Sequence, residues 1–461
     1  MNKIGFLKKI GLSICANAIS VGVSTILTFI IPKFWGVTDY GYWQLYLFYI
    51  SYVGMFHFGI QDGVYLRYGG KKEQDIDIAC VHSQFVFMIL LEVVISSVIA
   101  VISYFNIDNA ERSFIWYSFA ICLVLYIPNT FIQYYLQAVG EVKEYSLALV
   151  IEKITLLSII IIEMISTAFN FKLLISADLF AKSIGLIYII LCNKKIAFNK
   201  WNGWKKCIQE IESSLKAGFF LLISNLADSM IIGITRLVIE NCWTIDVFAK
   251  TSFAISFSSF ILIFIVAVGQ IIFPELKSVD KVEMPMIYEK FDKVFIMVGM
   301  LLFCLYTPLQ RLIIEWIPKY YESCYYFIFV IPICVFQSKS IMLLFTFYKL
   351  LREEKKLFSI NIFGLALTAC MVLISTTVFN DVNLVLLSAT IGTGFRCIVL
   401  ELYLSRQIPI KVVKSIIIES VLTALFICLY AFEIPRDYLI YLGVYLLTMY
   451  VFVKDKNRKR V

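Results

Sequence analysis

Charged residues are scarce in this sequence. Asp, Glu, Lys and Arg together make up 16% of its 461 residues, whereas the residues AVILMFWYC make up 60%. A water-soluble domain typically carries about 25% charged residues, which it needs to cover its surface. The mean hydropathy of +0.84 agrees with this shortage of polar groups. The composition excludes an ordinary soluble fold and predicts a protein that lies in a lipid bilayer.

Motifs for catalysis, metal binding and ATP hydrolysis are also absent. The chain has two histidines, His57 and His82, in no H-E-x-x-H or other ligand spacing. It contains no G-x-S-x-G nucleophile motif and no G-x-x-x-x-G-K-[ST] phosphate loop. Its twelve cysteines form no C-x-x-C pair, which favours small buried side chains over redox chemistry. We therefore expect no metal, no cofactor and no enzymatic activity.

Long apolar runs separated by short polar turns are the main positive feature. A helix that crosses a bilayer needs about 20 mostly apolar residues, and such runs are typical of helical bundles rather than of barrels. The predicted fold class is all-α, an integral membrane protein with about 14 transmembrane helices. The expected spans are 10–31, 41–66, 79–104, 113–136, 145–168, 173–192, 217–238, 247–273, 294–316, 325–348, 357–378, 383–404, 413–432 and 437–453.

Lysine and arginine alternate between the two sides of these spans. With the N-terminus in the cytoplasm, 29 of the 41 cations fall in cytoplasmic segments and five in outward turns. The five are Lys33, Arg112, Lys172, Lys319 and Arg436. Positive charge concentrates in cytoplasmic loops of membrane proteins, so we expect both termini to be cytoplasmic. The net charge of +8 is then mainly a topology signal, and no nucleic acid partner is expected.

The longest cytoplasmic segment divides the spans into groups. We expect an N-terminal six-helix lobe over 1–192, a cytoplasmic linker over 193–216 and a C-terminal six-helix lobe over 217–405. Residues 406–461 add two further helices and a basic tail. Two six-helix lobes around a central cavity are typical of transporters built from repeats.

Seven cations remain inside the predicted spans. They are Lys153, Lys182, Arg236, Lys250, Arg311, Lys339 and Arg396. Each costs at least about 2.5–3.5 kcal/mol at a helix centre unless it faces a partner or water. All except Arg311, which can reach the outer surface, are predicted to line an aqueous cavity and bind substrate. The alternative interpretation is structural ion pairing.

The two interpretations differ from one cation to the next. Asp178 and Lys182 lie four residues apart on one helix face and can form an ion pair. Lys153 directly follows Glu152, but neighbouring residues on a helix point about 100° apart, so this pair is not expected to share a face. Lys339 and Arg396 have no acid within one helical turn, and they are the strongest candidates for substrate contact.

Further polar residues lie inside the apolar runs. Asp178 and Asp228 are candidates for ion coupling. Asn17, Asn129, Gln133 and Asn225 are candidates for a polar cavity wall that could solvate sugar hydroxyls. Hydrogen bonding between helices, which membrane bundles use routinely, is the alternative for these four residues.

Three sequence stretches resemble a known family. The stretch IPKFWGVTDYGY over 31–42, the stretch FGIQDG over 58–63 and the stretch YYLQAVG over 134–140 are similar to span endings of the polysaccharide (O-antigen, Wzx-type) flippases. The region from Asp228 to Phe273-Pro274-Glu275 resembles the start of that family's second lobe. The family belongs to a superfamily that also contains multidrug and toxin exporters.

The resemblance implies a transporter that moves undecaprenyl-diphosphate-linked oligosaccharide across the bacterial inner membrane. It also implies a cationic central cavity, formed here by Lys153, Lys182, Arg236, Lys250, Lys339 and Arg396. Expected partners are the lipid-linked substrate, membrane lipids and a polysaccharide polymerase or assembly machinery.

Two alternative functions stay open. A multidrug or organic-cation antiporter of the same superfamily would need a cavity dominated by carboxylates, whereas cations near the midplane are at least as numerous here. A membrane glycan polymerase or glycosyltransferase generally needs a large outward loop, and the outward turns predicted here are about 4 to 11 residues long.

Overall fold

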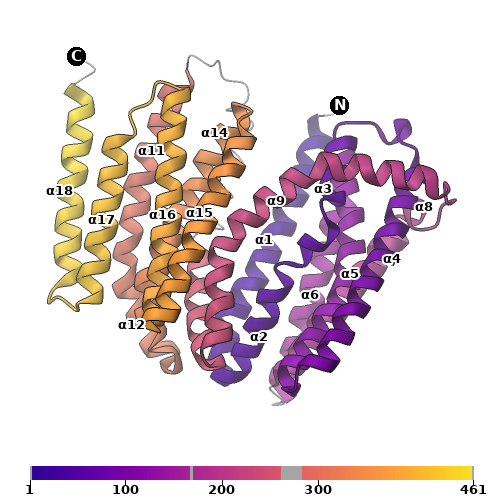
Figure 1. The fold of residues 1–461 in the computed structure, drawn as a ribbon, viewed down its shortest axis with the longest axis horizontal. Coiled ribbons are helices and arrows are strands. Elements are labelled where there is room, and N and C mark those ends of the chain that lie inside the picture. Colours follow the sequence, from indigo (N-terminus) through magenta and orange to yellow (C-terminus); the bar gives the residue numbers. More distant parts are fainter. Residues whose placement is uncertain (1–2, 167–169, 261–282, 459–461) are drawn as a thin grey trace. The chain divides into compact units, whose positions relative to one another are not determined.

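The computed structural model describes residues 3–166, 170–260 and 283–458. Regular secondary structure in these ranges is helical throughout, and none of the described residues lies in a strand (Figure 1). The predicted all-α fold class is confirmed. The second half of the predicted span 247–273, together with Phe273-Pro274-Glu275, lies outside the described residues.

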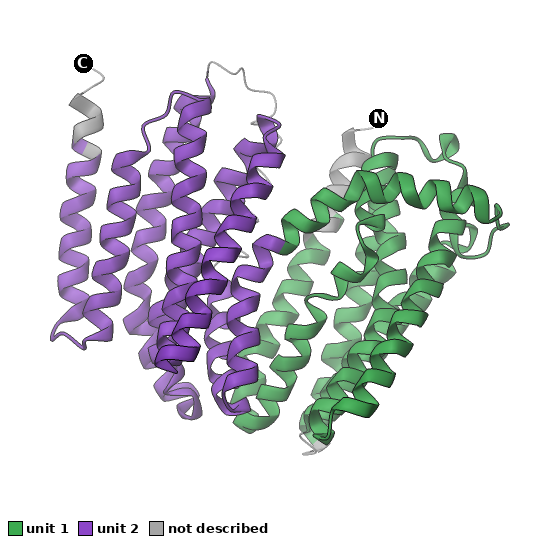
Figure 2. Cartoon of the chain, viewed as in Figure 1, with its two compact units in different colours: residues 1–226 green, residues 227–461 purple. Residues whose placement is uncertain are grey.

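Contacts divide the chain into two compact units, 1–226 and 227–461 (Figure 2). Unit 1 has a core built largely on α5, which contributes Leu123, Phe131 and Tyr135, all buried. Its helices are α1 (Lys3–Phe34), α2 (Val37–Ile50), η1 (Val53–His57), α3 (Ile60–Tyr68), η2 (Glu73–Asp75), α4 (Ile78–Asn106), α5 (Ala110–Val139), α6 (Val142–Ser166), α7 (Phe171–Cys192), α8 (Lys194–Ala197) and the first part of α9 (Trp204–Cys242).

Unit 2 is arranged around the apolar segment Ser323–Leu350, which begins with α13 and in which 89% of the residues of the apolar window are buried. Helices α11, α12, α16 and α17 all pack against α13, and α17 and α18 lie side by side (Figure 1). After α9 and a helical segment over 245–260, the helices are α11 (Met284–Leu301), η3 (Leu302–Leu305), α12 (Tyr306–Trp316), η4 (Pro318–Tyr320), α13 (Ser323–Lys339), η5 (Ser340–Leu344), α14 (Phe345–Leu350), α15 (Glu354–Ile374), η6 (Ser375–Phe379), α16 (Val382–Gln407), α17 (Val413–Ala431) and α18 (Asp437–Arg458).

Ten helices of the described part are long and apolar enough to cross a membrane. They make the chain a multi-pass membrane protein. The count of about 14 spans stays a prediction.

The second predicted span is interrupted. The sequence predicts one continuous helix over 41–66, but α2 ends at Ile50 and α3 begins at Ile60. Between them Phe58 and Gly59 have φ angles of 51° and 89°. Positive φ is incompatible with a right-handed helix and is costly for every residue except glycine. The chain therefore turns sharply here, and the prediction of a continuous span is wrong.

The glycines of the FGIQDG stretch make a close helix contact in unit 1. A Cβ atom on Gly63 would lie 1.9 Å from the carbonyl oxygen of Ser214 on α9. A Cβ on Gly218 would lie 2.0 Å from the carbonyl oxygen of Gly59. Only glycine fits at such backbone-to-backbone distances. This part of the family resemblance thus has a packing explanation, namely the crossing of α3 and α9.

The predicted linker over 193–216 is helical along much of its length. Residues from Trp204 onward belong to α9, which continues without a break to Cys242. The boundary between the two units falls at 226/227, inside this helix. The side chain of Arg67 ties the start of α9 to α3, because it donates hydrogen bonds to the Glu210 carboxylate and the Ser214 hydroxyl at 2.7 and 2.8 Å.

Candidate functional site

A cluster of three carboxylates surrounds Lys339 at the end of α13. Its ammonium lies 2.9 Å from the carboxylate of Asp292 on α11 and 2.6 Å from that of Glu419 on α17. It also forms an ion pair with Glu401 on α16. The Lys339 side chain is 1% exposed, and the three acids are buried as well. One lysine thereby connects four helices of unit 2.

Neutral hydroxyls complete this Lys339 cluster. The Tyr288 hydroxyl donates to Glu401 Oε1 at 3.2 Å, and the Ser415 hydroxyl donates to Asp292 Oδ2 at 2.6 Å. Glu401 Oε2 is buried and has no hydrogen-bond partner among the described residues. Fully ionised, the cluster would carry three negative charges against one positive charge. Burial of unbalanced charge is costly, so the described residues reach neutrality only with protons on two of the carboxylates or with a further cation.

The three acids of the Lys339 cluster were not among the candidates predicted from sequence. Glu401 and Glu419 lie inside predicted spans, at 383–404 and 413–432, and the rule applied to cations in apolar runs would have found them. Asp292 lies two residues before the predicted span 294–316 and looked like part of a cytoplasmic turn. In the structure it belongs to α11 and is buried.

Arg396 forms a closed polar ring with two side chains from other helices of unit 2. Its guanidinium pairs with the Asp228 carboxylate and donates to Gln337 Oε1 at 2.6 Å. Gln337 in turn donates to Asp228 Oδ2 at 2.9 Å. Arg396 is 0% exposed, whereas the Asp228 side chain is 15% exposed. A ligand or proton can therefore reach the ring at the Asp228 carboxylate but not at the Arg396 guanidinium.

Replacing Asp228 by asparagine should destabilise unit 2. The change leaves the buried guanidinium without a carboxylate, and removal of one partner of a buried pair costs about 3–5 kcal/mol. We expect less monodisperse protein after detergent extraction and a lower unfolding temperature. Glu315→Gln, which neutralises an exposed acid at the end of α12, is the matched control and should leave both quantities unchanged. Equal thermal stability of the two variants would contradict the structural importance of the ring.

In unit 1, Lys182 lies in a further buried ion pair. Asp178 and Lys182, one turn apart on α7, are in contact, as their spacing predicts. The Tyr46 hydroxyl of α2 donates to Asp178 Oδ2 at 2.7 Å. The side chains of Asp178 and Lys182 are 4% and 6% exposed. This pair fastens α7 to α2.

Lys153 does pair with its neighbour, contrary to the expectation from helix geometry. Its ammonium lies 3.6 Å from Glu152 Oε1, and the Lys153 side chain is 22% exposed. The expectation considered only the directions of the Cα–Cβ bonds. The flexible four-carbon stem of lysine lets the ammonium bend round the helix towards the acid. Lys153 is nevertheless more accessible than Lys182, Lys339 or Arg396.

Arg236 and Lys250 lie at partly exposed positions in unit 2. The Arg236 guanidinium donates to the Ser252 hydroxyl at 3.2 Å and lies 5.4 Å from the centre of the Phe248 ring. Lys250 forms an ion pair with Glu322 at 2.8 Å, in which its side chain is 18% exposed. Both side chains are more accessible than that of Lys339.

The four predicted polar residues fall into two groups. Asn129 and Gln133 are buried on α5, and Gln133 donates to Asn129 Oδ1 at 3.0 Å. This contact lies within one helix, so it does not test the alternative of hydrogen bonding between helices. Asn17 on α1 and Asn225 on α9 are exposed at the surface of unit 1. A role for any of the four in a cavity wall stays a prediction.

The structure thus separates the six predicted cations. Lys182, Lys339 and Arg396 are buried and neutralised by carboxylates, while Lys153, Arg236 and Lys250 are partly exposed. Within the described ranges no three His, Cys, Asp or Glu side chains are arranged to hold a metal ion. The chemistry available is ion pairing and proton binding.

Solved structures with a similar fold were found, although no protein-family model and no curated protein matches the chain. The lipid II flippase MurJ in an inward closed conformation has a TM-score of 0.68 and 15% sequence identity, over 97% of this chain and 99% of that one. An inward-facing multidrug resistance MATE family transporter of the MOP superfamily has a TM-score of 0.62 and 13% identity, over 84% of this chain and 96% of that one. An outward-facing transporter of the same description has a TM-score of 0.53 and 14% identity, over 86% of this chain and 94% of that one. The chain shares the fold of these membrane transporters.

The two likenesses differ in how much of this chain they cover. Only 3% of this chain lies outside the likeness to MurJ, so the final helices α17 and α18, about a tenth of the chain, must take part in it. The likeness to the inward-facing MATE transporter leaves 16% of the chain outside. Glu419, which lies on α17, therefore belongs to a region that the MurJ fold also has.

Proposed function

We propose that the protein is a flippase for lipid-linked oligosaccharide in the bacterial inner membrane, with both termini in the cytoplasm. The observation that carries this proposal is the likeness to the lipid II flippase over 97% of the chain, which includes α17 and α18. The substrate is an undecaprenyl-diphosphate-linked repeat unit of a surface polysaccharide such as O-antigen, as the resemblance of the FGIQDG and YYLQAVG stretches implies. Movement of the substrate follows alternating access.

The partly exposed cations are the better candidates for first contact with the substrate. Lys153 in unit 1 and Arg236 in unit 2 are partly exposed, so an anionic diphosphate or acidic sugar can reach them. Lys182, Lys339 and Arg396 would first have to leave their carboxylates. Their position supports a role in holding helices together in this conformation.

A proton on Asp228 would link ion coupling to substrate binding. Asp228 is the accessible member of its ring, and protonation would cancel its charge while Arg396 keeps its own. The guanidinium would then be available for bidentate binding of a phosphate group. In unit 1, a proton on Asp178 would in the same way leave the Lys182 ammonium available to a phosphate group. In the proposed cycle a proton and the diphosphate thus bind together.

A strain that lacks the protein provides the test. We expect complete undecaprenyl-diphosphate-linked saccharides to accumulate where a membrane-impermeant oxidant cannot reach them in spheroplasts, and surface polysaccharide to disappear. The wild-type chain should restore both. Lys153→Gln should restore them poorly at equal abundance, whereas Lys216→Gln, which changes a lysine on α9 that is 74% exposed, should restore them fully.

Two results would overturn the proposal. Unchanged surface polysaccharide, with increased sensitivity of the strain to organic cations, would identify a drug antiporter. Saccharides that reach the outer leaflet but stay short would point to a failure of polymerisation rather than of flipping.

A further inference from the structure

A polar pocket lies at one end of unit 2, away from the buried ion pairs. It has a volume of about 560 Å³ and is formed by the turn between α12 and α13, the start of α16, and the turn between α17 and α18. These helix ends are all on the predicted outward side of the membrane. The size lies within the range of small-molecule pockets, about 300–1,000 Å³.

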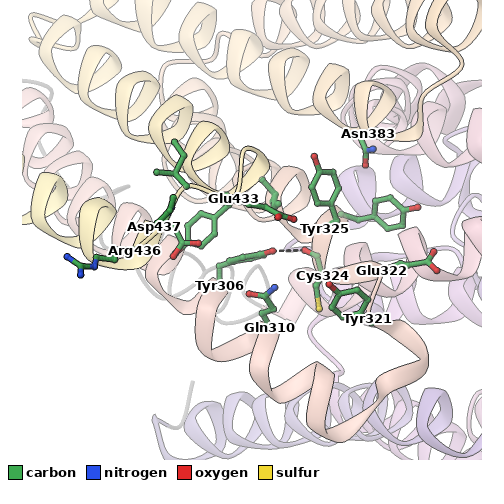
Figure 3. A pocket seen from close by; sticks show the side chains of 15 residues that line it. Tyr306, Gln310, Tyr321, Glu322, Cys324, Tyr325, Asn383, Glu433, Arg436 and Asp437 are labelled. Atoms are coloured by element: carbon green, nitrogen blue, oxygen red, sulfur yellow. Dashed lines mark hydrogen bonds between the residues drawn. The ribbon is translucent and has the colours of Figure 1, made fainter.

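Tyrosine rings line much of this pocket, and hydrogen bonds fix the positions of two of them. Tyr306 and Tyr430 are buried, with ring centres 4.5 Å apart in an edge-to-face arrangement. The Tyr306 hydroxyl donates to the Cys324 carbonyl oxygen at 3.0 Å, and the Tyr430 hydroxyl is 3.0 Å from that of Thr307. Tyr321, 61% exposed, stands at the rim (Figure 3).

These rings differ from an ordinary aromatic belt. Tyrosines of a membrane interface lie on the lipid-facing surface, and exposed Tyr321 fits that description. Tyr306 and Tyr430 do not, because they are buried within unit 2 and still line the pocket. Both rings pack on each other and on Phe426, and they form part of the pocket wall.

One acid in the pocket has no counter-ion within the described part of the chain. The Glu433 side chain is exposed and makes no hydrogen bond or ion pair with a described residue. Its backbone N–H donates to the Tyr430 carbonyl oxygen at 3.4 Å, and its φ of 49° is left-handed. The other acids are engaged: Glu322 pairs with Lys250 at 2.8 Å, and Asp437 accepts the Tyr438 backbone N–H at 2.6 Å. Arg436 lines the pocket edge, with its guanidinium directed away from the tyrosines (Figure 3).

Amide groups add neutral polar contacts. The Gln310 side chain on α12 makes no hydrogen bond with a described residue and lines the pocket near Tyr306 (Figure 3). Asn383 Oδ1 at the start of α16 is buried and accepts no hydrogen bond from the described residues. Both side chains can bind hydroxyl or ammonium groups of a ligand.

We propose that this pocket binds an organic ammonium group, with Glu433 as its counter-ion and the tyrosines of the wall, Tyr306, Tyr321 and Tyr430, against its carbon skeleton. Aromatic faces and carboxylates both attract ammonium groups. An anionic ligand would meet the carboxylate of Glu433 and is disfavoured. The ligand is an amino sugar or a small organic cation, and the site stands independently of the proposed flippase activity, which needs no amine in its substrate.

Binding to the full-length protein in lipid nanodiscs tests this site. The probes are glucosamine, N-acetylglucosamine, which lacks the charge, and tetraethylammonium, which lacks the hydroxyls. We expect N-acetylglucosamine to bind at least roughly tenfold more weakly than glucosamine, as loss of a charge-assisted contact implies. Glu433→Gln should weaken glucosamine binding by a similar factor, and Glu315→Gln, which alters an exposed glutamate outside the pocket, should not.

The outcomes separate the two sources of the ammonium group. Binding of both glucosamine and tetraethylammonium supports the site and points to a free organic cation. Binding of glucosamine alone supports the site and points to an amino sugar. Absence of binding by both amines, equal binding of the two sugars, or unchanged binding by Glu433→Gln overturns the proposal, whatever the result of the flippase test.

Discussion

Replacing Lys339 by methionine is expected to remove most of the correctly folded protein from the membrane. Methionine matches the length of the stem but leaves Asp292, Glu401 and Glu419 facing one another without a cation. Loss of one partner from a buried ion pair costs about 3–5 kcal/mol, which is a large fraction of the stability of a typical protein. The measurement is the height of the monodisperse peak of a fluorescent fusion in size-exclusion chromatography after detergent extraction.

Charge balance supplies the matched control for this variant. Glu419→Gln removes one of two excess negative charges and resembles the protonated acid in shape, so we expect a peak close to that of the wild type. The combined variant Lys339→Met, Glu401→Gln, Glu419→Gln should recover much of the lost peak, because buried ion pairs can often be replaced by neutral groups. Abundant monodisperse Lys339→Met protein would show that the cluster is not needed for folding.

The same set of variants tests the prediction that Lys339 contacts substrate. If the combined variant folds and also restores surface polysaccharide in the deletion strain, the lysine serves structure alone. If it folds but does not restore polysaccharide, Lys339 acts in transport as well. Stability and transport must therefore be measured on the same preparations.

The second large effect is expected from Gly63→Ala. The added Cβ would lie 1.9 Å from the Ser214 carbonyl oxygen, a backbone atom that cannot rotate away. Helix α3 has to move off α9, and this also disturbs the bond between Arg67 and Glu210. Overpacking of a tight contact usually lowers the free energy of unfolding by about 1–3 kcal/mol. We expect a collision with a backbone atom to cost at least as much as the upper end of this range. We expect the unfolding temperature to fall by on the order of 10 °C.

Gly443→Ala is the control for this prediction. Gly443 lies within α18, and a Cβ there would meet nothing within 4 Å. Alanine is also the better helix former by about 1 kcal/mol, so this variant should be as stable as the wild type or slightly more so. A fall of the same size in both variants would show that the α3–α9 contact has no special importance. Gly218→Ala should reproduce the effect from the other side of the contact.

Several features could be predicted because they depend on residues close together in the sequence. The apolar runs predicted a helical membrane protein, and the ten long apolar helices agree with this prediction. The pair Asp178–Lys182 followed from its spacing of four residues. The stretch over 134–140, which resembles a span ending, does contain the end of α5 at Val139, followed by Gly140 with φ 78°. In each of these cases the residues that determine the feature lie close together along one helix.

Other features could not be predicted, because their cause lies on another helix. The sequence shows Lys339 and Arg396 without a nearby acid, whereas their carboxylates lie 80 and 168 residues away, at Glu419 and Asp228. In the sequence, Phe58 and Gly59 lie in an apolar stretch that shows no break. The turn of the chain at these residues is explained only by the close approach of α9. The pairing of Lys153 with Glu152 was not expected from the backbone geometry of a helix, but the flexible lysine side chain makes it.

The sequence by itself determined that this protein is a helical membrane protein with few and unevenly distributed charges, since hydropathy and composition are properties of the chain alone. The tertiary structure decided which of the rare cations are neutralised and which stay accessible, and it brought tyrosines and one unpaired acid into a common pocket. The physical reason is that a charge in an apolar interior is tolerated only beside its partner. Which partner that is depends on how helices distant in sequence pack together.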